Sequence, residues 1–305
     1  MQESHPDFYT YPFSFTKTLR RDPYPFVAAE KPGNSAGGKI IVVTGAGSGI
    51  GAAAAKVWAR ANATGIVIIG RRLPELEKVR DEIAGLNKET KVLVVSADIS
   101  IEEDVKSLFA KIQDTFGRGA DVLLNNASVL NDGKKFGEGS LGEWWSTIDI
   151  NTKGTALMIH YYINSQPDPK NPVGTVICVL SARVGFTMPT GSGYNVSKMA
   201  TQVLVEHVQA EYPTLRTFTT MPGVVLSDMT NDYWKTYAKD HADLTGLQAL
   251  YLAQPRADYL KGLMVSVNWD LEVMEAHKEE IVEGKLLRHT WIASLPFYGG
   301  SGLGA

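Results

Sequence analysis

Residues 39–51 read KIIVVTGAGSGIG, which predicts a buried strand that leads through a glycine-rich turn into a helix. The apolar run before Gly45 is unbroken, as expected for a parallel strand that is covered on both faces. The alanine-rich segment that follows, residues 50–61, predicts a helix. A strand, a tight turn and a helix in this order open a βαβ unit, so the chain is expected to contain a parallel sheet.

Apolar runs and amphipathic segments alternate along the rest of the chain. The expected strands are residues 39–45, 65–70, 91–98, 120–128, 174–181, 214–223 and 262–269. The expected helices are residues 50–61, 74–86, 100–117, about 143–164 and a segment that begins at Tyr194. This alternation predicts an α/β fold, namely a Rossmann-like, doubly wound parallel sheet of about seven strands in a single domain. Ser100 and Glu103 have the spacing of a capping box at the start of the third helix.

Composition separates an N-terminal arm from the domain. Residues 1–38 are rich in aromatic residues and proline and have neither a helical nor a strand period. We expect them to form an extended arm that lies on its own domain or on a neighbouring subunit. Residues 39–305 form the expected domain, which includes a substrate lid at about 226–256 and a C-terminal extension at about 271–305.

Charge and composition exclude several classes of protein. The 305 residues carry a net formal charge of −3, which gives no electrostatic reason to bind nucleic acid or an anionic membrane. No apolar run reaches the ~18 residues of a transmembrane helix, and residues 1–10 lack the apolar core of a secretory signal. Cys178 is the single cysteine, so no internal disulfide is expected and a reducing, cytoplasmic compartment is predicted. His160 and His207 lack partners at metal-ligand spacing, so no metal site is expected.

The glycine-rich turn has the sequence context of a dinucleotide-binding fingerprint, because a strand precedes it and a helix follows. Gly45 permits the tight turn, whereas Gly49 and Gly51 let the backbone approach a pyrophosphate. Ser48 and Ile50 lie between these glycines and belong to the same predicted site. The positive end of the helix dipole would then face the phosphates.

The end of the second strand indicates which nicotinamide cofactor is bound. A carboxylate at this place accepts the ribose 2′-hydroxyl of NAD, whereas an arginine accommodates the 2′-phosphate of NADP. This chain has Gly70, Arg71 and Arg72 there and no carboxylate. We therefore expect NADP(H), with Arg71 on the phosphate and Arg72 beside it. The alternative is a solvated pair of arginines at a helix entrance.

Four polar residues further along complete a recognisable pattern. Ser181 closes the fifth expected strand, at the sheet edge where open α/β sheets bind ligands. Tyr194 and Lys198 are one helical turn apart and share a face, and Asn151 follows an aromatic helix.

From about residue 39 to 270 the chain resembles the short-chain dehydrogenase/reductase family. The resemblance rests on the order and spacing of these four residues and of further motifs, namely TGAGSGIG, Asp98, NNA at 125–127 and PGVVLS at 222–227. Residues 15–25 and 262–274 resemble, more loosely, members found in fungi, many of them tied to secondary metabolism.

The resemblance implies a proton-transfer role for this group of residues. Hydride transfer to a ketone leaves an alkoxide that must take a proton. Tyr194 would give this proton in reduction or remove it in oxidation, while Ser181 would donate a hydrogen bond to the substrate oxygen. The charge of Lys198 would lower the pKa of Tyr194, and its ammonium would bind the nicotinamide ribose. Asn151 would hold a water that connects Lys198 to solvent.

The resemblance also implies further cofactor contacts. Asp98 and Ile99 would contact the adenine, and Asn125 and Ala127 would line the floor of the cofactor site. Candidates from the PGVVLS motif are Pro222, Gly223, Val225 and Ser227, of which the last two would bind the carboxamide of nicotinamide. Ser128 departs from the family pattern, in which a glycine follows NNA.

The substrate pocket is expected between residues 182–193 and 226–256. Its candidate residues are Phe186, Met188, Met229, Tyr233 and Trp234. These side chains favour a bulky apolar or aromatic substrate. The alternative is that they fill the core beneath a lid.

The predicted function is the NADP(H)-dependent interconversion of a ketone and a secondary alcohol. Two alternatives remain open, a redox-neutral isomerisation, dehydration or cyclisation in the same pocket, and cofactor binding without catalysis. The resemblance also implies a homodimer or homotetramer joined through helices at about 151–165 and 194–211. The expected partner is a small-molecule substrate, with neither nucleic acid nor a membrane span involved.

Overall fold

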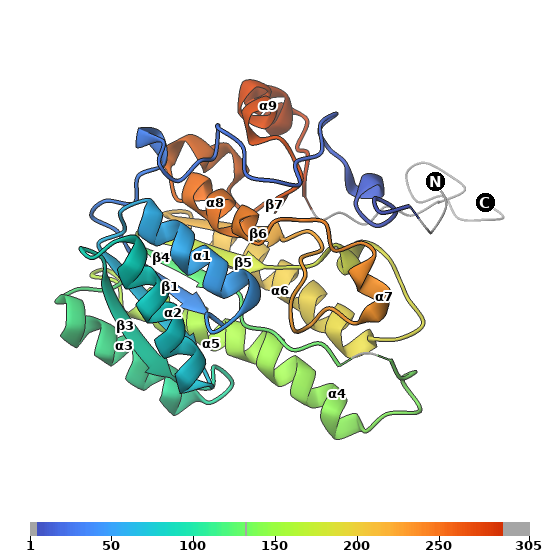
Figure 1. Cartoon of the computed structure of the whole chain (residues 1–305), viewed down its shortest axis with the longest axis horizontal. Helices are drawn as coiled ribbons and strands as arrows, with labels where there is room; N and C mark the ends of the chain where they lie inside the picture. Colours follow the sequence, from blue (N-terminus) through green and yellow to red (C-terminus); the bar gives the residue numbers. More distant parts are fainter. Residues whose placement is uncertain (1–4, 132, 289–305) are drawn as a thin grey trace, which may run out of the picture.

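The computed structural model describes residues 5–131 and 133–288, and at its centre lies a sheet of seven parallel strands in the order β3-β2-β1-β4-β5-β6-β7 (Figure 1). The strands are β1 Ile40–Thr44, β2 Gly65–Gly70, β3 Lys91–Ser96, β4 Val122–Asn125, β5 Gly174–Val179, β6 Leu215–Met221 and β7 Met264–Ser266. The predicted doubly wound sheet is therefore confirmed. The strand order reverses between β1 and β4, which is the place where open α/β sheets bind ligands.

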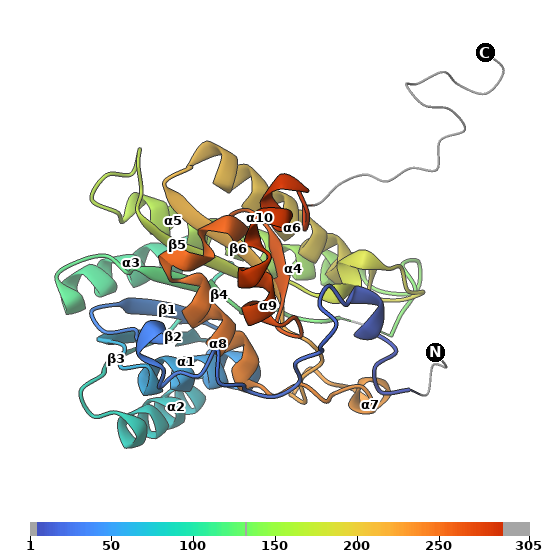
Figure 2. The ribbon, with the colours of Figure 1, turned by 90° about the horizontal axis from the view of Figure 1, so that it is seen from above.

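Helices cover both faces of the sheet (Figures 1 and 2). One layer contains α1 (Gly49–Arg60), α2 (Leu73–Leu86) and α8 (Asp243–Leu252). The other layer contains α3 (Glu102–Phe116), α5 (Gly154–Asn164) and α6 (Ser192–Glu211). The shorter helices are α4 Leu141–Ile148, α7 Asp232–Lys235, α9 Leu271–Ala276 and α10 Lys278–Glu283.

The side chains of β1 alternate between the two layers, as the pleat of a strand requires. Ile41 lies in the buried cluster that contains Trp58 of α1. Ile40 lies in the opposite cluster, which contains Ile159 of α5. The unbroken apolar run in the sequence thus reflects a strand that is buried on both faces.

Two local expectations need correction. The helix predicted over residues 143–164 contains a π-helical segment, Asp149–Lys153, between α4 and α5. The predicted capping box is wrong, because α3 begins at Glu102 and Ile101 precedes it without a side-chain cap. Ser100 lies one residue before the helix N-cap, and its hydroxyl donates to Asp98 Oδ1 at 2.7 Å.

The N-terminal arm lies along its own chain. Its described residues, 5–38, contain two short 3₁₀ segments, Tyr11–Phe13 and Pro32–Asn34. Leu19 forms an isolated antiparallel bridge with Trp269, and Tyr24 is buried in the same cluster as Trp58. Figure 2 shows the arm, in dark blue, passing beside α9 and α7.

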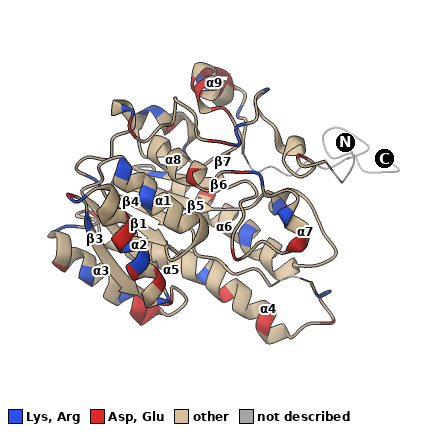
Figure 3. Ribbon diagram, in the orientation of Figure 1, with Lys and Arg blue, Asp and Glu red and all other residues tan. Residues whose placement is uncertain are grey.

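Charges of both signs are interspersed over the helices in the view of Figure 3. Among residues 5–131 and 133–288, no helix combines the length and the apolar character that crossing a bilayer requires. The expected C-terminal extension begins with α9 and α10. Its remaining part, residues 289–305, lies outside the described residues.

The close packing of α1 against α8 yields a stability prediction. A Cβ added at Gly246 of α8 would lie 2.7 Å from the Cα of Ala54 and 2.9 Å from the Cβ of Val57, both in α1. Overpacking of this kind costs about 1–3 kcal/mol, so Gly246→Ala is expected to lower the free energy of unfolding by that amount in a denaturant titration.

Gly85→Ala is the matched control, because a Cβ at Gly85 of α2 would meet nothing within 4 Å. Alanine has the higher helix propensity, so this variant is expected to be as stable as the parent or up to about 1 kcal/mol more stable. Equal losses in the two variants would contradict the packing argument.

Candidate active site

The glycine-rich turn forms a cradle that side chains would fill. Gly45 has a φ of +66°, and a Cβ there would lie 2.9 Å from the Cα of Ala127. A Cβ at Gly51 would lie 2.4 Å from the carbonyl oxygen of Gly45. The turn leads into α1 at Ser48, whose side chain makes no cap, so the first N–H groups of the helix are left for another acceptor.

A cavity lies over this cradle at the carboxyl ends of the strands. It is bordered by the turn, by the ends of β2 and β3, and by the loop after β4. The predicted cofactor residues that line it are Gly45, Ser48, Gly49, Ile50, Arg71, Arg72, Asp98, Ile99, Ala127 and Ser227. The buried Ser128 hydroxyl also belongs to this cavity and has no hydrogen-bond partner among the described residues. A polar ligand with a phosphate at the helix terminus, such as a dinucleotide, therefore fits the residues present.

Asn125 and Gly51 do not line this cavity. The side chain of Asn125 is buried, and its amide nitrogen lies 3.7 Å from the sulfur of Cys178. Its neighbour Asn126 lines the cavity and donates to the carbonyl oxygen of Thr44 at 2.9 Å. Asn126 was not among the predicted cofactor residues, because two adjacent asparagines at a strand end give no signal for which side chain points outward.

The two arginines after β2 are exposed at the rim of the cavity. Arg71 Nη1 lies 3.9 Å from Asp98 Oδ2, and its side chain is 63% exposed. Arg72 Nη2 lies 3.4 Å from the Ser48 hydroxyl and 3.7 Å from Asp228 Oδ2. Burial alone would raise the pKa of Asp98, but hydrogen bonds from Ser100 and the charge of Arg71 hold it below its usual value. Both arginines can therefore reach a group bound at the turn.

A second cavity adjoins the first and contains the predicted catalytic serine and tyrosine. The two cavities share Ile50, Ser227 and Met229. Other predicted residues in the second cavity are Ser181, Phe186, Tyr194, Pro222, Gly223, Val225 and Trp234. Met188 and Tyr233 are not among its lining residues, whereas Tyr9, Thr10 and Phe13 of the N-terminal arm line it without having been predicted. Of the expected lid, the residues that border the cavities are Ser227, Asp228, Met229, Thr230 and Trp234, while α8 packs against α1.

Three of the four proposed catalytic residues meet at the end of β5. The side chains of Ser181 and Tyr194 line the same cavity, and the interaction with Ser181 lowers the pKa of the tyrosine. Lys198 lies one turn further along α6, with its Nζ 5.6 Å from the centroid of the Tyr194 ring. This ammonium is buried and donates to the carbonyl oxygen of Val179 at 2.8 Å, which uses one of its three donors.

Asn151 lies within the π-helical segment and is buried beside the same helix. Its Nδ2 donates to the Val129 carbonyl oxygen at 2.9 Å and to the Ser197 hydroxyl at 3.0 Å. Its Oδ1 accepts from the Val129 N–H at 2.8 Å. Such π segments occur often at functional sites, and here the segment ties the loop after β4 to α6 next to Lys198.

Burial controls the protonation of the tyrosine and the lysine. It raises the pKa of Tyr194, and the interaction with the Ser181 side chain and the charge of Arg183 oppose this effect. It lowers the pKa of Lys198 to about 8. The role of Lys198 in lowering the pKa of Tyr194 stays a prediction, and Arg183 is a second cation beside the ring whose charge opposes the effect of burial. The Arg183 guanidinium carbon lies 5.5 Å from the tyrosine ring centroid.

Other polar groups give no second centre. Cys178 is buried, and this burial raises the pKa of its thiol to about 12, so it is not a reactive thiolate. In the described part of the chain, no cluster of three or more His, Cys, Asp or Glu side chains is placed to hold a metal ion.

Comparison with known proteins agrees with this geometry. The family model for short chain dehydrogenases matches residues 39–238. Short chain dehydrogenase andI of Emericella variicolor is 30% identical over 261 residues, which cover 83% of this chain and 89% of the relative. Short chain dehydrogenase mpl6 of Monascus purpureus is 28% identical over 286 residues, which cover 90% of this chain and 96% of the relative. Both relatives are fungal, as the looser resemblance predicted.

Solved structures share the fold. The 3-ketoacyl-(acyl-carrier-protein) reductase from Brucella melitensis, complexed with NADH, superposes with a TM-score of 0.68 at 26% identity, covering 76% of this chain and 98% of that one. A short-chain type dehydrogenase/reductase from Mycobacterium marinum has a TM-score of 0.70 at 23% identity, covering 77% and 96%, and indicates the fold alone. With the family model matched over most of the domain, this chain belongs to the short-chain dehydrogenase/reductase family of oxidoreductases, which bind a nicotinamide cofactor.

Proposed function

We propose that this protein is an NADP(H)-dependent oxidoreductase that interconverts a ketone and a secondary alcohol on a bulky apolar or aromatic substrate, with Tyr194 as the acid or base. The observation that carries the proposal is that Ser181 and Tyr194 line one cavity, with Lys198 buried beside the tyrosine, and that this cavity adjoins the cofactor cavity at Ile50, Ser227 and Met229. One cavity fits a dinucleotide. The other is walled by aromatic and aliphatic side chains, including Phe186 and Trp234.

The chain's own residues supply the proton and the orientation. When bound, the reduced nicotinamide supplies the hydride that forms the new C–H bond at the carbonyl carbon. Ser181 donates a hydrogen bond to the carbonyl oxygen, and the Tyr194 O–H proton passes to that oxygen as the C=O π bond breaks. Because burial raises the pKa of Tyr194, the phenol is neutral at physiological pH and carries the proton that reduction requires.

Three further residues support this chemistry. Lys198 presents an ammonium whose remaining donors suit the ribose of the cofactor, and Asn151 fixes the backbone next to it through Ser197. Arg183 opposes the effect of burial on Tyr194, so that the phenolate left after proton transfer is less costly. Release of the proton to the substrate oxygen is then easier than it would be in a purely apolar pocket.

The arginine after β2 supports NADP(H) over NAD(H). Arg71 borders the cofactor cavity at the place where a 2′-phosphate would lie, and no carboxylate follows β2 to accept a ribose hydroxyl. The side chain is exposed, so its guanidinium is free of a burial cost and can fork onto a phosphate.

Two other functions would use the same cavities, a redox-neutral conversion and cofactor binding without catalysis. The buried lysine argues against cofactor binding without catalysis, because an idle pocket gains nothing from a desolvated ammonium beside a tyrosine. Incubation with a panel of ketones and NADPH, with the absorbance of the reduced cofactor followed over time, separates the three. Consumption of NADPH with a ketone supports the proposal, and product formation without it supports the redox-neutral alternative.

The first prediction concerns cofactor choice. Arg71→Ser is expected to raise the Kd for NADPH by about tenfold or more, because a charge-assisted bond to phosphate is lost, and to leave the Kd for NADH unchanged. The Kd values are measured by fluorescence titration. The control is Arg80→Ser, which removes an exposed arginine within α2 and is expected to change neither Kd value. Equal losses for both cofactors in Arg71→Ser would exclude a phosphate contact.

A second prediction separates proton transfer from binding. Tyr194→Phe keeps the ring and its packing but removes the acid, so kcat/KM for a ketone substrate is expected to fall by ~10²–10⁴ while the Kd for NADPH stays the same. Tyr161→Phe is the control, because the Tyr161 hydroxyl lies on the far side of α5 and donates its hydrogen bond to Glu102. Turnover at the parent rate in Tyr194→Phe would show that Tyr194 is not the acid.

A third prediction follows from the burial of Lys198. Its pKa in the folded protein, about 8, lies below the ordinary value of 10.5, so folding opposes its protonation. The free-energy cost of burying the charged lysine is complete below pH 8, falls between pH 8 and 10.5 and is absent above pH 10.5. Above that pH the lysine is neutral in both the folded and the unfolded state. Lys198→Met is therefore expected to raise the free energy of unfolding at pH 7, by up to about 3 kcal/mol, and to lose this gain as the pH approaches 10.5.

The same variant is expected to bind NADPH more weakly and to turn over more slowly, since the ammonium and its donors are gone. Denaturant titrations at pH 7 and pH 10 measure the first effect, and cofactor titration measures the second. A variant that is less stable than the parent at both pH values would show that the bond to Val179 outweighs the cost of burial.

A further inference from the structure

The N-terminal arm forms one wall of the cavity that contains Tyr194. Tyr9, Thr10 and Phe13 line this cavity together with the proposed catalytic pair. The ring of Tyr9 stacks on Phe186, with centroids 5.5 Å apart and planes inclined by 26°, and lies 4.8 Å from the ring of Trp234. The arm thus contacts the loop after β5 and the helix α7, both of which border the cavity.

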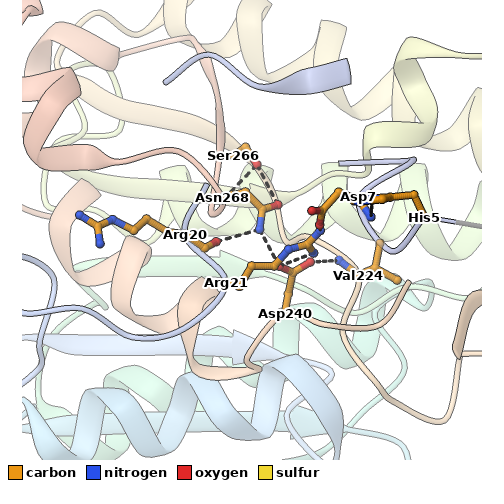
Figure 4. Close-up of polar contacts among 8 residues, drawn as sticks. All are labelled: His5, Asp7, Arg20, Arg21, Val224, Asp240, Ser266 and Asn268. Carbon is orange, nitrogen blue, oxygen red and sulfur yellow. Dashed lines mark hydrogen bonds and ion pairs between the residues drawn. The ribbon is translucent and has the colours of Figure 1, made fainter. Parts of the chain in front are cut away.

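The position of the arm depends on one buried carboxylate (Figure 4). The Asp240 side chain is 0% exposed and accepts hydrogen bonds from three segments of the chain. Its Oδ1 accepts from Arg21 of the arm at 2.9 Å and from Asn268, beyond β7, at 2.6 Å. Its Oδ2 accepts from the N–H of Val224, in the loop after β6. A single side chain therefore joins the arm to two other walls of the cavity.

Arg21 connects this carboxylate to the start of the arm. Its guanidinium contacts Asp240 and also Asp7, two residues before Tyr9 (Figure 4). Asn268 adds a backbone contact, because its Nδ2 donates to the Arg20 carbonyl oxygen at 2.9 Å. Both ends of the segment between residues 7 and 21 are thereby held, and the lining residues Tyr9 and Phe13 lie between these two points.

Burial makes this anchor sensitive to its partner. A buried carboxylate is costly unless it is paired, and burial raises the pKa of Asp240 while the charge of Arg21 opposes that rise. Loss of Arg21 would leave the carboxylate with amide donors alone. The arm would then lose its charged attachment, whereas the glycine-rich turn and Lys198 lie outside these contacts.

We propose that the arm is a specificity element of the active site, in which Tyr9 and Phe13 contact the apolar ring system of a bulky ketone and Arg21 and Asp240 act as positioning residues. The inference rests on the proposed function for the place at which the substrate binds. The class of ligand follows from the wall, which presents aromatic rings in the same cavity as Ser181 and Tyr194.

The test compares two tyrosines of the arm. Tyr9 lines the cavity, whereas Tyr11 is 59% exposed and does not. The probes are cyclohexanone, acetophenone and 9-fluorenone, with Kd measured by calorimetry on the protein saturated with NADP⁺ and kcat/KM measured with NADPH. The quantity compared is the ratio of the Kd for 9-fluorenone to the Kd for cyclohexanone. Tyr9→Ala is expected to raise this ratio about tenfold, because the larger ring system loses an aromatic contact. Tyr11→Ala is expected to leave this ratio unchanged.

A second pair of variants tests the positioning residues. Arg21→Gln is expected to shift the ratio of 9-fluorenone to cyclohexanone in the same direction as Tyr9→Ala. The shift should come through KM rather than kcat, and the Kd for NADPH should not change. Lys17→Gln, on an exposed lysine of the same arm, is the control and is expected to behave as the parent. Tyr9→Phe keeps the ring and loses only its hydrogen bond to Tyr233, so it is expected to retain the parental ratio even if the alanine variant does not fold.

The outcomes distinguish this inference from the proposed function. Equal ratios in Tyr9→Ala and Tyr11→Ala, or a parent protein that binds none of the ketones, would overturn the role of the arm. Arg21→Gln with the parental ratio would overturn the positioning role. If ketones bind but no NADPH is consumed, the proposed reaction is wrong, while the Kd ratios still decide whether the arm selects the ligand.

Discussion

The common direction of the seven strands is the constraint on which the candidate site depends. Parallel strands have their carboxyl ends at one edge, so the loops that leave them converge although they are far apart in sequence. Gly45, Arg71 and Asp98 follow β1, β2 and β3, and Ser181 and Gly223 follow β5 and β6. Reversal of any one of these strands would carry its loop to the opposite edge and remove a wall from one of the two cavities. Burial of both faces of the sheet keeps the strands in place.

The burial that stabilises the sheet is costly at the centre of the site. Lys198 and Tyr194 are both buried, and the loss of water disfavours their charged forms, so the pKa of the lysine falls and that of the tyrosine rises. A methionine or leucine at position 198 would avoid this cost. Retention of an ammonium where an apolar group would be more stable is typical of a site under functional rather than structural demand. The bond to Val179 reduces the cost for Lys198 and the charge of Arg183 reduces it for Tyr194, without removing either.

Sequence reasoning succeeded where the signal is local and was incomplete where it depends on tertiary contacts. Apolar runs and glycine spacing mark each strand and the turn at Gly45, because burial on both faces and close backbone approach restrict the residue types directly. The π segment around Asn151 has no such signature, since it depends on contacts with the loop after β4. Asn126 rather than Asn125 lines the cavity for a similar reason. Arg183 reads as a surface residue in a polar loop and becomes a buried cation only when the loop folds over Tyr194.

The N-terminal arm shows the same difference between local sequence signals and tertiary contacts. Residues 5–38 carry no periodic pattern, yet they reach the cavity because one buried carboxylate, Asp240, binds them to the ends of β6 and β7. The groups proposed to move the proton lie on the sheet edge and α6, whereas the wall formed by Tyr9 and Phe13 belongs to a segment outside the sheet. Under the proposal above, substitutions in this wall would change the shape of the pocket and leave Ser181 and Tyr194 in place. Such an arrangement would separate the residues that select a substrate from those that transform it.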